Sequence, residues 1–159
     1  MPAPSAWRPA DWVSPCSAVA STGGAVYGDF VAPPNVESYA KDPESPYGIA
    51  KFSVELYLAY YARVHGLDYI ALRFANVFGP RQDPHGEAGV VAIFCQRILS
   101  GAPLTVFGDG GQTRDYVYVG DVARAHVRAA RHATIPAGKV DDRAFNLGTG
   151  RETSVVELA

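Results

Sequence analysis

A tyrosine and a lysine four residues apart are the first residues in this chain that could do chemistry. Tyr47 and Lys51 enclose the stretch "YGIAK", directly after Ser45 and Pro46. In a helix this spacing puts both side chains on one face, so the phenol and the ammonium can point into the same site. A nearby cation and the positive end of a helix dipole favour the phenolate, which could exchange a proton with a substrate hydroxyl. The spacing alone also fits a purely structural helix.

Two hydroxyl side chains precede this pair by about 25 residues. Ser21 and Thr22 begin the stretch "STGGAVYG", and the residues before them, "SAVAS", predict a short strand over 17–21. Open α/β sheets bind ligands at the carboxyl ends of their strands, and glycines there allow a ligand to approach the backbone closely. A hydroxyl, a Tyr-x-x-x-Lys helix and a later strand ending in "RFANVFGPR" form an ordered set. This order favours a catalytic role for Tyr47 and Lys51 over a purely structural one.

The elements that must position these residues alternate between strand and helix. Ser45 is a good N-cap and Pro46 a good first helical residue, and the amphipathic pattern continues to about residue 65, where Gly66 ends it. The next stretch, "LDYIALRFANVFG", is almost continuously apolar, as in a strand that is buried on both faces. A parallel β-α-β unit is therefore expected.

The rest of the chain continues the alternation. The pattern predicts a helix over 89–100, strands over 104–108 and 114–119, a helix capped by Asp121 up to residue 132, a strand over 143–148 and a helix capped by Ser154. We interpret Gly148-x-Gly150 as a structural strand-to-helix turn, because no third glycine and no further β-α-β follow. The predicted fold class is α/β, a partial Rossmann-like doubly wound parallel sheet plus part of a smaller substrate-binding region.

Composition excludes several classes of function. With 48% hydrophobic and 19% charged residues among 159, the chain resembles a globular domain. No apolar stretch approaches the ~20 residues that span a bilayer, and no signal peptide is apparent, so we expect a cytoplasmic protein without membrane contact. A net charge of -2 without a basic stripe argues against nucleic acid. Cys16, Cys95 and the four histidines lack metal-ligand spacing, so no metal is expected, and Cys95 is predicted to be a buried core residue.

Five stretches follow one another in an order that identifies a family. They are "ASTGGAVYGD", "SPYGIAK", "LRFANVFGPRQDPHGEAGVVAIF", "VFGDGGQTRDYVYVGDVARA" and "FNLGTGRETS". From residue 20 onward, the chain resembles the second half of extended short-chain dehydrogenases/reductases, in their nucleotide-sugar epimerase/dehydratase branch. The resemblance implies NAD as cofactor, a UDP-sugar as substrate and 4-epimerisation between UDP-glucose and UDP-galactose. It divides the chain into a non-family leader (1–17), half of an NAD-binding domain (18–75) and a partial nucleotide-sugar-binding region (76–159).

The resemblance also implies roles for single residues. Tyr47 matches the catalytic acid–base, and Lys51 the residue that binds the nicotinamide ribose and stabilises the phenolate. Thr22, with Ser21 as the alternative, matches the hydroxyl that hydrogen-bonds the reacting sugar oxygen. The backbone of Phe74 matches a contact to the nicotinamide carboxamide. The remaining matches are to residues that contact the nucleotide sugar. Asn76 matches a side-chain amide that contacts it, Val90 and Val91 match the helix start at the diphosphate, and Thr105 and Phe107 match the segment beside the uracil. Arg114 matches the arginine that pairs with the diphosphate. For Arg114, a surface ion pair with Asp115 or Asp121 is the alternative.

Three alternatives stay open. One is another epimerase of the same family, acting on a nucleotide sugar that is N-acetylated or a uronate. A nucleotide-sugar dehydratase needs an extra acid and base after the threonine, where this chain has Gly23 and Gly24, so an epimerase is preferred. The chain also lacks the G-x-x-G-x-x-G turn of the family's first half and ends in the first turn of its last predicted helix, which suggests an inactive fragment that binds NAD weakly. For the full-length parent, the resemblance implies a homodimer that pairs through the helix carrying Tyr47.

Overall fold

The computed structural model describes residues 16–29, 33–85, 89–131, 135–136 and 138–159. Strands and helices alternate along most of these residues, as predicted, although β3 directly follows β2 and β6 directly follows β5. In chain order the elements are β1 (Ser17–Thr22), α1 (Pro46–His65), β2 (Tyr69–Phe74), β3 (Asn76–Phe78), α2 (Val90–Leu99), β4 (Thr113–Tyr118), α3 (Val119–Ala130), the 3-10 helix η2 (Val140–Arg143), β5 (Ala144–Leu147), β6 (Glu152–Ser154) and α4 (Val155–Leu158).

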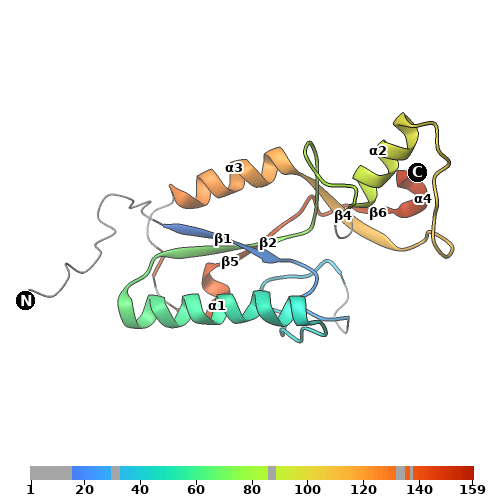
Figure 1. The fold of residues 1–159 in the computed structure, drawn as a ribbon. Coiled ribbons are helices and arrows are strands. Elements are labelled where there is room, and N and C mark those ends of the chain that lie inside the picture. The colour runs from blue at the N-terminus through green and yellow to red at the C-terminus, as the bar shows by residue number, and fades with distance from the viewer. Residues whose placement is uncertain (1–15, 30–32, 86–88, 132–134, 137) are drawn as a thin grey trace, which may run out of the picture.

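A parallel sheet with strand order β1-β2-β5 forms the main layer. Helix α1 covers one face of this sheet and α3 covers the other (Figure 1). The central strand, β2, is buried along nearly its whole length, because helices cover both of its faces. Alanines of α1 pack against this sheet in a cluster made of Ala59, Ala62, Tyr69, Ala71 and Ala144. The predicted α/β fold with a doubly wound parallel sheet is confirmed.

Local sequence signals determine the ends of α1. The side chain of Ser45 accepts a hydrogen bond from the backbone N–H of Gly48 at 3.1 Å, and Pro46 is the first helical residue. At the other end, Gly66 takes the left-handed conformation with φ 69°. The predicted helix from Pro46 to about residue 65 is therefore confirmed.

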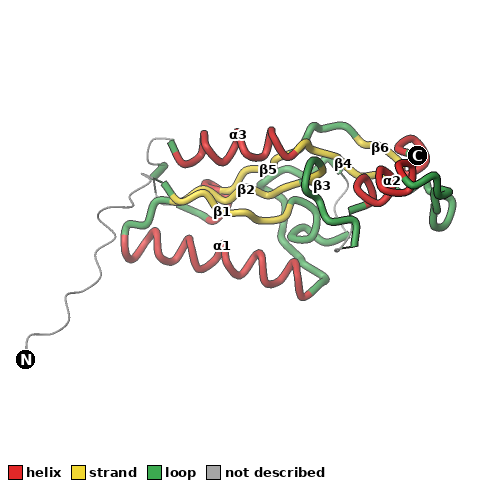
Figure 2. The backbone as a smooth tube through the Cα atoms, turned by 45° about the horizontal axis from the view of Figure 1, so that its top comes forward, coloured by secondary structure: helices red, strands yellow, loops and turns green. Residues whose placement is uncertain are grey.

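A second, smaller sheet holds β3, β4 and β6, where β3 pairs parallel and β6 antiparallel with β4. It extends the molecule beyond the carboxyl ends of β1 and β2, next to α2 and α4 (Figure 1, and from another side Figure 2). The prediction of one strand through 67–79 is wrong, because the stretch is divided at Ala75 between the two sheets. The N–H of Ala75 still donates to Leu147 O at 2.9 Å, and the chain then leaves the first sheet.

Three other sequence predictions are wrong in detail. Residues 104–108 form no strand, since no neighbouring strand pairs with them in the described structure. Asp121 is not the cap of α3 but lies in its first turn, where it pairs with Arg124, and Tyr118 occupies the N-cap position. Cys95 is exposed on α2, whereas its neighbour Phe94 is buried. An apolar run on a helix thus does not show which of its residues face inward.

The expected leader over 1–17 falls mostly outside the described residues, which begin at Cys16. Cys16 is buried and Ser17 begins β1, so these two residues belong to the fold. The division of the chain near residue 75 stays a prediction. Among the described residues, no helix is long and apolar enough to cross a membrane, and no three metal-binding side chains cluster.

Candidate active site

Tyr47 and Lys51 lie in the first turns of α1, at the carboxyl end of β1. The Nζ atom of Lys51 is 5.8 Å from the centre of the Tyr47 ring and donates to Ala20 O at 3.3 Å. The Tyr47 side chain is 55% exposed, so its phenol is accessible to a ligand. Gly48, between Tyr47 and Lys51, packs tightly on the turn after β1. A Cβ at this position would collide with the carbonyl oxygen of Ala25. The helix therefore starts directly against the end of β1.

The two candidate hydroxyls at the end of β1 have different surroundings. Ser21 is only 4% exposed, and its hydroxyl donates a hydrogen bond of 2.5 Å to Oε1 of Glu55. Thr22 is half-buried, and its hydroxyl has no hydrogen-bond partner among the described residues. The following residue, Gly23, donates its N–H to Phe74 O at 2.7 Å, and a Cβ at this position would lie 3.0 Å from that oxygen. Of the two hydroxyls, that of Ser21 is therefore held by Glu55, and that of Thr22 is not.

Phe74 and Asn76 lie where the chain passes from the main sheet to the smaller one. Phe74 ends β2 directly opposite Thr22 in the strand register, and its carbonyl oxygen is already bound by Gly23. Its ring lies 5.3 Å from that of His126 on α3. Asn76 begins β3 and is exposed. The structure thus brings Thr22 and Phe74 side by side at the carboxyl ends of β1 and β2, and Asn76 follows two residues later.

The predicted diphosphate and uracil residues lie in the smaller sheet and around α2. Val90 begins α2 after Gly89, with no side-chain cap, and Val91 lines an open, mostly apolar groove of 780 Å³. Arg114 is exposed on β4, and its only hydrogen bond among the described residues is to Thr113 O at 2.8 Å. The alternative ion pairs of Arg114 are therefore not formed. Thr105 and Phe107 are both exposed, in the loop that was predicted to be a strand.

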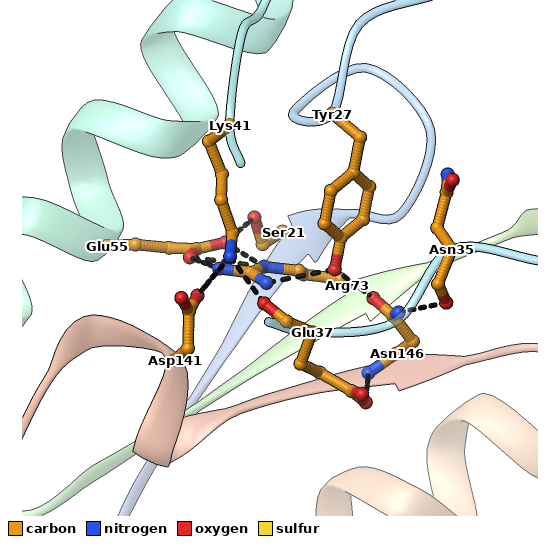
Figure 3. A network of polar contacts seen from close by, with 9 residues as sticks. All are labelled: Ser21, Tyr27, Asn35, Glu37, Lys41, Glu55, Arg73, Asp141 and Asn146. Carbon is orange, nitrogen blue, oxygen red and sulfur yellow. Dashed lines mark hydrogen bonds and ion pairs between the residues drawn. The ribbon is translucent and has the colours of Figure 1, made fainter. Parts of the chain in front are cut away.

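A buried polar cluster beside the candidate pair is a feature that the sequence analysis missed. Glu55 on α1 and Arg73 on β2 are both fully buried, and Nη2 of Arg73 lies 2.6 Å from Oε2 of Glu55 (Figure 3). Burial alone would lower the pKa of Arg73, but the hydrogen bonds and the charge of Glu55 raise it above its usual value. Two features of the sequence could have indicated this pair: an arginine inside the apolar stretch "YIALRF", and a glutamate one helical turn after Lys51.

The turn with Gly148 and Gly150 is closed by a carboxylate. Asp115 accepts hydrogen bonds from Thr149 N, from Thr149 Oγ1 at 2.7 Å and from Gly150 N at 2.8 Å. A phosphate at this turn would have to replace the carboxylate that already holds these donors. The interpretation of this turn as structural is supported.

Comparison with known proteins gives one consistent result. Residues 15–148 match the model of the NAD dependent epimerase/dehydratase family. The UDP-glucose 4-epimerase of Mycolicibacterium smegmatis is 51% identical over 138 residues, which are 87% of this chain and 42% of that protein. The crystal structure of UDP-glucose 4-epimerase from Thermotoga maritima with UDP-glucose is 52% identical with a TM-score of 0.80, over 89% of this chain and 44% of the other.

A third relative was crystallised with the cofactor. The structure of Thermus thermophilus UDP-glucose 4-epimerase in complex with NAD is 44% identical with a TM-score of 0.76, over 89% of this chain and 45% of the other. In all three comparisons the chain spans less than half of the relative's length.

Proposed function

Because the chain belongs to the NAD dependent epimerase/dehydratase family, we propose that the protein containing it is an NAD-dependent 4-epimerase that interconverts UDP-glucose and UDP-galactose. The observation that carries this proposal is the Tyr47–Lys51 pair on α1, where Lys51 donates to Ala20 O, two residues before Thr22 at the carboxyl end of β1. The pair offers a proton acceptor and a cation, and the end of β1 beside it offers a hydroxyl. The whole protein, meaning the longest natural polypeptide that contains this chain, is the subject of the proposal.

In the proposed reaction the phenolate of Tyr47 takes the proton of the sugar 4-hydroxyl. Lys51 stabilises that phenolate, and the Thr22 hydroxyl holds the reacting oxygen in place. Bound NAD would supply a hydride acceptor for sugar C4 and return the hydride to its opposite face. Tyr47 gives back its proton when the 4-keto sugar is reduced, so every proton and hydride that leaves is returned.

The residues present fit part of the NAD site. Lys51 uses one of its three N–H donors on Ala20 O, which leaves two for the hydroxyls of a ribose. The exposed phenol of Tyr47 lies beside it. Phe74 fits less well, because its carbonyl oxygen is bound by Gly23. A glycine-rich turn for the pyrophosphate is absent from the sequence.

The groups proposed for the nucleotide sugar lie along the groove and the smaller sheet. Arg114 is an exposed cation without an ion-pair partner in the described structure, which suits a diphosphate. The apolar side of the groove includes Val91 and suits the uncharged part of a sugar nucleotide. Asn76, Val90, Thr105 and Phe107 keep the roles that the resemblance implies, as proposals.

Three further points belong to the same proposal. A dehydratase is the runner-up, and Gly23 and Gly24 argue against it because neither can transfer a proton. A homodimer through α1 is supported by exposed apolar side chains on that helix, among them Ile49, Leu56 and Tyr60. The proposed reaction belongs to galactose metabolism, and we place it in the cytoplasm as part of the proposal.

A label at sugar C4 tests the proposed reaction. The whole protein is incubated with NAD and UDP-galactose that carries deuterium at C4, and the products are separated by chromatography. We expect UDP-glucose with the deuterium still at C4, because the hydride leaves and returns within one site. A 4-keto-6-deoxy product would show a dehydratase, and the absence of any turnover would contradict both.

A further inference from the structure

The fully buried ion pair of Glu55 and Arg73 requires an explanation beyond stability. Arg73 Nε lies 3.1 and 3.2 Å from the two carboxylate oxygens of Glu55, and Nη2 lies 2.6 Å from Oε2. Removing two charges from water is costly, and apolar residues of similar size often stabilise a fold equally well. A buried pair can instead determine which of several packed arrangements forms. The question is which arrangement this pair selects.

The pair connects segments that are far apart in the sequence (Figure 3). Glu55 accepts a hydrogen bond from Ser21 at the end of β1. Arg73 donates to Tyr27 OH at 2.9 Å and to Oδ1 of Asp141 at 2.9 Å. Both charged groups thus have several partners, and the cluster joins β1, the turn after it, α1, β2 and η2.

The position of Glu55 on α1 relates this cluster to the candidate catalytic pair. Tyr47, Lys51 and Glu55 are spaced by four residues each, so they share one side of the helix. Lys51 donates to Ala20 O, and one turn later Glu55 accepts from Ser21 Oγ. Two contacts on consecutive turns bind α1 to consecutive residues of β1. They determine both the rotation of α1 and its position along β1.

We propose that Glu55, held by Arg73, is a positioning residue that sets the distance between the Tyr47–Lys51 pair and the Thr22 hydroxyl. By accepting a hydrogen bond from the Ser21 hydroxyl, it also leaves Thr22 as the hydroxyl available to the sugar. This inference rests on the proposed function. Glu55 itself is fully buried and touches no substrate.

The test compares two substitutions of the same kind in the whole protein. Glu55→Gln removes the carboxylate from the buried Arg73, and Asp68→Asn removes one from the buried Arg143, whose Nη2 lies 3.3 Å from Asp68 Oδ1. Asp68 precedes β2, at the opposite end of the sheet from Thr22. Both variants are assayed at a temperature at which circular dichroism shows them folded. We expect Glu55→Gln to lower kcat about 10- to 100-fold, with KM changed less than about threefold.

Asp68→Asn is expected to keep kcat within about twofold. Equal loss of kcat in the two variants, or an unchanged kcat in Glu55→Gln, would overturn the positioning role. Amide hydrogen exchange gives a readout that needs no activity. Over residues 46–55 it should be at least about tenfold faster in Glu55→Gln than in Asp68→Asn. If the unaltered protein does not epimerise the sugar, the proposed function fails. The positioning role is rejected separately if amide hydrogen exchange over residues 46–55 is equally fast in the two variants.

A milder substitution serves if Glu55→Gln does not fold. Ser21→Ala removes the hydrogen bond to Glu55 and leaves the ion pair intact. It should lower kcat about three- to tenfold at constant KM, well short of the loss in Thr22→Val. A wild-type kcat would show that the contact positions nothing. A loss as great as that of Thr22→Val would make Ser21 itself the reacting hydroxyl, which also contradicts the inference.

Discussion

The Nζ atom of Lys51 lies 5.8 Å from the centre of the Tyr47 ring, one turn along the same helix. This relationship alone would be common among helices. It gains meaning from the end of β1, because Lys51 also donates to Ala20 O, two residues before Thr22. The pair and the hydroxyl are therefore fixed to the same piece of backbone. Five predictions follow from this site and the fold around it.

Removing the phenol of Tyr47 should abolish most of the activity. In the whole protein we expect Tyr47→Phe to lower kcat by about 10²- to 10⁴-fold with little change in KM, because the ring stays and only the proton acceptor is lost. Steady-state kinetics with UDP-galactose measure both constants. Tyr39→Phe is the matched control, since Tyr39 is an exposed tyrosine in a loop. An unchanged kcat in Tyr47→Phe would remove Tyr47 from the mechanism.

Arg114 should act mainly on substrate affinity. A charge-assisted hydrogen bond contributes about 1.5–3 kcal/mol, so Arg114→Ala should raise KM for the UDP-sugar about 10- to 100-fold. Arg114→Lys keeps the charge without the planar fork and should recover only part of the affinity. The control is Arg124→Ala, which breaks an exposed ion pair with Asp121. Equal KM values for Arg114→Ala and Arg124→Ala would argue against a diphosphate contact.

Asp115 should be a structural residue. The substitution Asp115→Asn weakens the bonds to Thr149 and Gly150, so we expect the free energy of unfolding to fall by about 1–3 kcal/mol, as measured in urea. Asp83→Asn is the matched control, because among the described residues Asp83 accepts a single hydrogen bond, from the N–H of His85. A loss of stability no larger than the control's would mean that the carboxylate does not hold the turn.

Stability should fall in alkaline solution because of Tyr27. Burial raises the pKa of this phenol above its usual value of 10.0, although hydrogen bonding to Arg73 lowers it in part. As pH rises past about 10, the unfolded chain releases the proton first, so its free energy falls relative to the folded state. The stabilising difference is fully present below pH 10 and is lost as pH rises toward the folded-state pKa.

The measurement for Tyr27 is the urea midpoint as a function of pH. Above about pH 10, the urea midpoint should decline less steeply in Tyr27→Phe than in the unaltered protein. From pH 7 to 9, the urea midpoints of the two proteins should change in parallel. Tyr69 and Tyr116 also have raised pKa values through burial, so part of the decline should remain. Identical slopes above pH 10 would show that Tyr27 does not contribute.

The 159-residue chain by itself should bind NAD weakly, because its sequence contains no G-x-x-G-x-x-G turn. A ligand that binds the folded state raises its thermal stability, so a melting curve with and without NAD measures the effect. We expect a shift of less than about 1 °C at millimolar NAD, and a clear shift for the whole protein. A large shift in the isolated chain would mean that these residues suffice to hold NAD.

Several features of the fold were predictable because their causes are local. Ser45, Pro46 and Gly66 act on backbone groups within a few residues, so the ends of α1 followed from the sequence. The capping box of Ser154 and Glu157 at the start of α4 has the same origin. The predicted strand over 104–108 was wrong because a strand requires a neighbour, and no local pattern shows whether one is present.

By itself, the sequence determined which residues could react: the spacing of Tyr47 and Lys51 puts them on one side of a helix wherever that helix lies. Only the tertiary structure decided the partner of the Ser21 hydroxyl, which is Glu55, 34 residues away. The same holds for Arg73: its place in an apolar strand indicates burial, but its partner Glu55 is decided only when α1 packs on β2. Helix periodicity and capping are short-range effects, whereas the choice of a buried polar partner depends on how whole elements pack.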